Sequence, residues 1–209
     1  VGQRLTVIAW LWARTVKSPN PAFSHAEVPL ASTFVLSSKP GAKAYAEPVV
    51  EGDQYRFAIR VGEYPESAKN GTKLSRGANF QCVLSQTPIE PKYIKAEGVA
   101  GRIGQRMMAI VAEGPRGRIY LAPTKKQEFA AEQATPEWVP SIAFTKNSRH
   151  MTPWAYGISS FTDLFTKRQL VAMNTYSDLV IEATQKAHSD AVAAGYADNG
   201  ECLHEGGCS

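Results

Sequence analysis

The residues that could bind a metal lie in two short stretches far apart in the chain. Residues 17–30 and 80–89 each follow an extended run, make a tight polar turn and leave through a Pro followed by a branched aliphatic residue. A zinc ribbon is built from two such knuckles, each carrying two cysteines. Here the ligand positions hold Ser18 and Phe23 in the first knuckle, and Cys82 and Ser85 in the second. Because one thiolate cannot hold tetrahedral zinc, we expect a degenerate, metal-free ribbon held by packing; two unrelated loops are the alternative.

A second set of candidate residues is basic and surrounds a glycine-punctuated stretch. Glycines at 98, 101 and 104 could let the backbone approach a phosphate group. The nearby cations are opposed only by Glu97 and Glu113; they are Lys95, Arg102, Arg106, Arg116 and Arg118. We expect these five residues to contact a nucleic-acid backbone, with no array for reading bases. A solvated face is the alternative.

Residues 20–23 read Asn-Pro-Ala-Phe, which is close to a motif of enzymes that methylate the amino group of a flipped base. Ala22 replaces the second Pro of that motif. The chain has no glycine-rich turn after a strand with an acidic residue further on, so it shows no cofactor site. We therefore place the stretch in the first knuckle and assign no catalytic residue.

Two further groups are better explained by structural roles. Cys202, His204 and Cys208 could offer three metal ligands, but they lie in a tail with no further residues to orient them, so we predict no metal site there. Trp10 and Trp12 could stack on a base, but we expect them to pack in the core.

Length and composition are those of a small globular protein. The chain has 209 residues, 44% hydrophobic and 20% charged, which suffices for a buried core in one or two domains. A formal net charge of +4 is compatible with nucleic acid but is weak evidence for it. Three cysteines do not make a disulfide framework, and the apolar run at residues 5–11 is too short to span a bilayer. We expect a cytoplasmic protein without membrane contact.

The hydrophobic pattern predicts a β-rich first half. Residues 5–16 are apolar on both faces and indicate a buried central strand, with a buried helix as the alternative. A meander follows at 32–36, 43–50 and 55–61, in which Tyr55, Phe57, Ile59 and Val61 point inward. Residues 62–77 are polar and are expected to form a mobile loop. A hairpin is predicted at 105–112 and 116–121.

Helices are expected in the second half. Thr124 begins a capping box that opens a short helix, residues 135–160 have little regular structure, and Thr166 caps a long helix that Gly195 ends. The predicted fold class is thus α+β. We divide it into a β-rich, ribbon-like domain at 1–123, a helical part packed on it at 124–195, and a flexible tail at 196–209.

Several segments, in this order along the chain, carry a family resemblance. They are residues 6–16, 18–22, 93–98, 100–104, 116–124, 156–157, 161–172 and 204–207. The chain resembles the central segment of the large bacterial adenine-specific DNA methylases that contain a zinc ribbon. Residues 18–22 read Ser-Pro-Asn-Pro-Ala where that family has a Cys-Pro-Asn-Pro knuckle. The resemblance implies a ribbon that has lost its metal.

The resemblance implies a piece of a methylase rather than a working enzyme. In that family the segment lies between the cofactor-binding segment and an Asp-Pro-Pro-Tyr catalytic motif, and this chain contains neither. S-adenosylmethionine is therefore expected only for a full-length family member. We expect a non-catalytic accessory module that positions DNA, with DNA and a catalytic methylase domain or subunit as partners. The alternative is a small stand-alone protein-interaction module with no nucleic-acid role.

Overall fold

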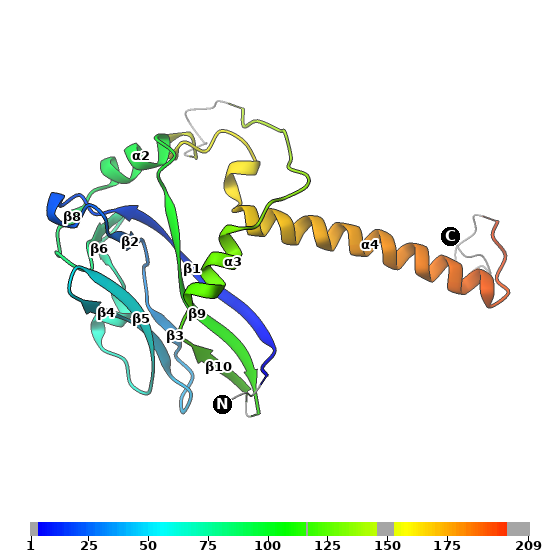
Figure 1. Cartoon of the computed structure of the whole chain (residues 1–209), viewed down its shortest axis with the longest axis horizontal. Coiled ribbons are helices and arrows are strands. Elements are labelled where there is room, and N and C mark those ends of the chain that lie inside the picture. The colour runs from blue at the N-terminus through cyan, green and yellow to red at the C-terminus, as the bar shows by residue number, and fades with distance from the viewer. Residues whose placement is uncertain (1–3, 116, 146–152, 200–209) are drawn as a thin grey trace. The chain divides into compact units, whose positions relative to one another are not determined.

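The structure, a computed structural model, describes residues 4–115, 117–145 and 153–199. It confirms the predicted α+β class: the described residues form ten strands in antiparallel sheets, several short helices and one long C-terminal helix (Figure 1). The chain forms two compact units. Unit 1 comprises Val1–Ala130 and Phe144–Ser159, and unit 2 comprises Ala131–Ala143 and Ser160–Ser209. Of the described residues that we expected in the helical part, 124–130, 144–145 and 153–159 fall in unit 1.

The largest sheet of unit 1 has the strand order β10-β9-β1-β2. β1 (Val7–Lys17) lies between β2 (Glu27–Pro29) and β9 (Gly104–Gly114), and β9 forms the predicted hairpin with β10 (Gly117–Leu121). The prediction that β1 is buried on both faces is wrong for its first half. Trp10 is 51% exposed, because the fully buried positions of this strand begin only at Ala13.

A second sheet of unit 1 is the predicted meander. It consists of β3 (Val35–Ser37), β4 (Ala44–Glu51) and β5 (Gln54–Val61). Phe57 lies in the core as predicted, with edge-to-face contacts to Phe34 and Tyr55 at centroid distances of 5.7 and 5.5 Å. Val61 was expected to point inward but is 81% exposed, because it ends the strand beyond the edge of this core.

The third sheet carries the second knuckle. It contains β6 (Lys73–Ser75), β7 (Asn79–Gln81) and β8 (Pro88–Ile89), and α1 (Glu66–Asn70) precedes it. The prediction of a mobile loop at 62–77 is therefore wrong. Thr72 explains the order of this segment: its buried hydroxyl donates to the Pro29 carbonyl at 2.5 Å and accepts the Ala31 N–H at 3.2 Å.

A helix that we did not predict follows the knuckle. α2 (Pro91–Val99) starts with a Pro at its first position, where the missing N–H costs nothing. It buries Ile94 against Val16 and Cys82 in a common core. A Cβ atom at Gly98 would lie 2.5 Å from the carbonyl oxygen of Tyr156, the last residue of the 3₁₀ turn η2 (Pro153–Tyr156). Gly98, which we considered for a close approach of the backbone to phosphate, thus makes a close packing contact with Tyr156.

The predicted helices of the second half are present. α3 (Lys125–Glu132) follows Thr124, whose hydroxyl contacts Gln127. α4 (Lys167–Ala193) begins with a capping box between Thr166 and Gln169 and ends before Gly195, which has a φ of +91°. In unit 2 the turn η3 (Thr162–Leu164) precedes α4, and Ala143 forms a β-bridge with Ser160. No helix among the described residues combines the length and apolar character needed to cross a membrane.

Candidate functional site

Three exposed cations lie on and just after α2, and two of them, Lys95 and Arg102, were predicted. Lys92 and Lys95 are exposed and one turn apart, and exposed Arg102 follows the helix. We call these three residues the α2 ridge. Lys95 also lies over the Tyr156 ring, with 5.9 Å between its Nζ atom and the ring centroid. Lys92 was missed by the sequence analysis, although Pro91 marks a helix start that places residues 92 and 95 on one face.

Arg102 forms an ion pair with Glu97. Its Nη2 and Nε atoms donate to the Glu97 carboxylate at 2.6 and 3.0 Å. Glu97 is buried, so it needs this partner, whereas the Arg102 side chain remains 58% exposed. The hydrogen bonds and charge of Glu97 raise the pKa of Arg102. The two lysines are therefore the ridge cations with no carboxylate partner in the described residues.

Arg106 does not face the same surface. Its guanidinium donates to the Tyr55 carbonyl at 2.9 Å and lies 4.5 Å from the centroid of the Tyr55 ring. Burial raises the pKa of Tyr55, and its hydroxyl donates to the Glu27 carbonyl at 2.6 Å. Arg106 thus joins two sheets of unit 1 through a cation–π and a hydrogen-bond contact.

Arg118 lies at the other end of the β9–β10 hairpin. It pairs in register with Glu113, seven residues along β9 from Arg106, a separation of roughly 23 Å at 3.3 Å per residue. Arg116 lies outside the described residues. The structure thus leaves Lys95 and Arg102 near each other but does not bring Arg106 and Arg118 to the same place.

The division into units separates the charges of the chain. Unit 1 contains 20 Lys and Arg against 10 Asp and Glu, a formal net charge of +10. Unit 2 contains three Lys and Arg against nine Asp and Glu, a net charge of −6. The net charge of +4 conceals this asymmetry. A unit this basic attracts polyanions even where single cations are scattered over its surface.

The structure brings three of the four predicted knuckle positions together. Ser18 and Ser85 both form hydrogen bonds with the buried thiol of Cys82. The knuckle closes through backbone hydrogen bonds from Cys82 N–H to Thr87 O and from Gln86 N–H to Cys82 O, each 2.9 Å long. Gln86 has a φ of +56°, a conformation uncommon for a residue other than glycine. These hydrogen bonds fix the backbone of the turn next to the Cys82 sulfur.

Phe23 does not join this network. It lies in the 3₁₀ turn η1 (Pro21–Phe23), where its backbone contacts Asn20 and Ala26. Asn20 instead reaches the second knuckle: its Nδ2 donates to Thr87 Oγ1 at 3.4 Å, while its Oδ1 accepts the Ala22 N–H at 3.0 Å. Both polar atoms of this amide thus serve the fold, which favours the structural interpretation of residues 20–23.

Two opposing effects set the pKa of Cys82. Burial raises it, but hydrogen bonds with Ser18, with Ser85 and with the backbone of Ser85 and Leu84 lower it, and the net shift is downward. Hydroxyl and N–H groups therefore stabilise the thiolate, and two of them belong to Ser18 and Ser85, at positions where a zinc ribbon has metal ligands.

Among the described residues no group of three or more His, Cys, Asp or Glu could hold a metal ion. The tail with Cys202, His204 and Cys208 lies outside the described residues.

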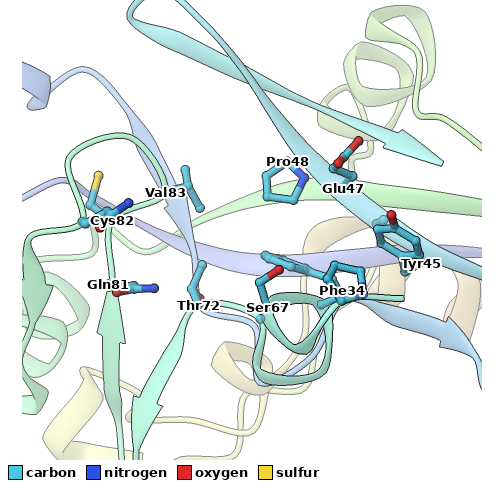
Figure 2. A pocket seen from close by; sticks show the side chains of 14 residues that line it. Phe34, Tyr45, Glu47, Pro48, Ser67, Thr72, Gln81, Cys82 and Val83 are labelled. Carbon is cyan, nitrogen blue, oxygen red and sulfur yellow. The ribbon is translucent and has the colours of Figure 1, made fainter. Parts of the chain in front are cut away.

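A small pocket borders this knuckle. It has a volume of about 180 Å³ and lies between β4, α1 and the segment from Gln81 to Gln86. Figure 2 shows Tyr45 and Pro48 on one side of it and Thr72 and Gln81 on the other. Figure 2 shows that the Cys82 sulfur does not point toward Phe34 across the pocket. Ser18 and Ser85, the hydrogen-bond partners of this thiol, do not line the pocket. The thiol is thus part of the knuckle rather than a group presented to a ligand.

Comparisons with known proteins identify no relative: no family model, no curated protein and no solved structure matches the chain. The resemblance to adenine-specific DNA methylases therefore stays a prediction.

Proposed function

We propose that unit 1 is a non-catalytic module that binds the backbone of DNA, as an accessory part of a methylase-like protein in the cytoplasm. The observation that carries this proposal is the charge of +10 on unit 1, beside −6 on unit 2. Counterion release makes a surface of this kind bind duplex DNA without sequence preference.

The α2 ridge is the part of unit 1 best suited to contact phosphates. Lys92 and Lys95 are exposed and lie on a helix whose other face is anchored in the core through Ile94. A rigid helix holds the two charges about one turn apart, close to 5 Å. A lysine ammonium group lacks the planar pair of donors with which arginine binds a base edge, so it suits phosphates better. The contact therefore positions DNA without reading its sequence.

Exposed Trp10 provides a second feature that suits nucleic acid. An indole that is half exposed on a strand offers a face on which an unpaired base can stack. This contact would matter if the module held DNA near a base that a catalytic domain flips out of the duplex. The catalytic domain or subunit itself would have to be supplied elsewhere, because this chain shows no cofactor motif.

Fluorescence anisotropy with labelled duplexes of unrelated sequence tests the proposal. The parent chain should bind them all with similar affinity, and Lys92→Gln/Lys95→Gln should weaken all of them alike. The matched control is Lys167→Gln/Lys186→Gln, which removes two exposed lysines from unit 2 and should leave DNA affinity unchanged. A parent that does not bind at low salt, or a control that weakens binding equally, would contradict the proposal.

A further inference from the structure

Unit 2 contains a groove whose lining includes none of the residues that we propose to contact DNA. It forms where residues 137–142 and 161–165 pack on the first turns of α4, and it has a volume of about 740 Å³. Two hydrogen bonds fix its sides: Phe161 N–H donates to Ile142 O at 3.0 Å, and Asn174 Nδ2 donates to Trp138 O at 2.9 Å. Buried Leu170 forms the base. The volume is within the range of about 300–1,000 Å³ typical of ligand sites.

The walls of the groove are apolar and open to solvent. Trp138 is 66% exposed, and Ile142 and Met173 are also exposed. The apolar surface continues beyond the groove along α4, where Tyr176 and Val180 are 72% and 65% exposed. Met173, Tyr176 and Val180 are spaced at three and four residues, so they lie on one face of the helix. The surface is therefore elongated rather than a compact cavity.

Two carboxylates lie at this apolar surface. Glu137 and Asp178 both line the groove, and neither has an ion pair or a side-chain hydrogen bond within the described residues. Lys186, further along α4, is already paired with Asp190 at 3.2 Å. With a net charge of −6 on unit 2, the groove attracts a cationic ligand and repels DNA or a second copy of the same unit.

We propose that this groove binds a basic amphipathic helix of a partner protein. The apolar face from Leu170 to Val180 is roughly 15 Å long at 1.5 Å per residue, which matches two to three turns of a helix laid in the groove. Such a helix would place apolar side chains at i, i+3 or i+4, and i+7 against Trp138 and Met173. Its Lys or Arg residues would lie beside Glu137 and Asp178. The elongated shape favours a helix over a compact organic cation.

Synthetic helical peptides provide the probe. Fluorescence anisotropy with the full chain would compare a labelled Leu/Lys amphipathic peptide, a Leu/Glu peptide with the same apolar pattern, and a Ser/Lys peptide without apolar anchors. Only the Leu/Lys peptide should bind. Glu137→Gln/Asp178→Asn and the exposed-site variant Trp138→Ala should each weaken it several-fold, whereas the control Asp190→Asn should not. Circular dichroism would confirm that each variant keeps the helix content of the parent.

Three outcomes would overturn the proposal. One is equal binding of the Leu/Glu peptide, which would mean that charge does not select the ligand. Another is unchanged Leu/Lys affinity in the double variant and in Trp138→Ala, which would place binding elsewhere. The third comes from sedimentation: a dimer of the parent that Trp138→Ala converts to a monomer would show that a second copy occupies the groove.

Discussion

Gly98→Ala tests the packing that holds the α2 ridge in place. In the helix interior alone, alanine is more favourable than glycine by about 1 kcal/mol. In this structure the added Cβ atom would lie 2.5 Å from the Tyr156 carbonyl oxygen and 2.9 Å from its carbon. Both contacts are with backbone, so no side chain can rotate away. Overpacking costs roughly 1–3 kcal/mol, and we take the upper end because backbone must move.

The clash therefore exceeds the gain in helix propensity. We expect a net loss of about 2 kcal/mol in the free energy of unfolding, which lowers the melting temperature by roughly 4–8 °C for a chain of this size. Thermal unfolding followed by circular dichroism measures this shift. The control Ala96→Gly, at an exposed position of the same helix, should lose only about 1 kcal/mol from propensity. A Gly98→Ala variant that gains stability would show that α2 does not pack on η2, and the argument would fail.

Three further predictions concern the knuckle and the chemistry of residues 20–23. The pKa of Cys82 is lowered in the folded state, so between the folded and the unfolded pKa the unfolded state binds more protons. The free energy of unfolding should therefore rise as the pH increases from the folded pKa to the pKa of the free thiol, and this gain should be lost as the pH is lowered through the folded pKa. Urea unfolding from neutral to alkaline pH should show this rise in the parent and not in Cys82→Ser. Elemental analysis of protein purified without added metal should find no stoichiometric zinc; zinc lost together with the fold on chelation would contradict the degenerate ribbon. Calorimetry should detect no S-adenosylmethionine binding, and micromolar binding would make Asn20 and Phe23 catalytic candidates.

Local patterns in the sequence were sufficient for the long strands, for the β9–β10 hairpin and for α3 and α4. Alternation of apolar and polar residues predicted β5, and the capping signals at Thr166 and Gly195 predicted both ends of α4. The knuckle positions Ser18, Cys82 and Ser85 could be found from spacing and resemblance, and the structure brings them into contact. For β5 and α4 the deciding interactions lie within a few residues, whereas the two distant halves of the knuckle could be paired because they resemble one known motif.

The start of α2 at Pro91 was a local signal that we overlooked, but other missed features depend on contacts between distant segments. The exposure of Trp10 is decided by where the elements that cover β1 lie, which its apolar pattern does not reveal. The order of residues 62–77 comes from the hydrogen bonds of Thr72 with Pro29 and Ala31, some forty residues away in the chain. The five predicted cations do not share one surface for the same reason, because Arg106 contacts Tyr55 on another sheet.

The central claim is that the basic unit binds DNA through phosphate contacts that include Lys92 and Lys95. The most direct test is the slope of the logarithm of duplex affinity against the logarithm of salt concentration. Each phosphate contact contributes about −0.9 to that slope for B-form DNA, so Lys92→Gln/Lys95→Gln should flatten it by about 1.8. Between 50 and 200 mM salt, the double variant should then lose roughly 12-fold less affinity than the parent loses. An identical slope in parent and variant, or a parent whose affinity does not depend on salt, would contradict the account.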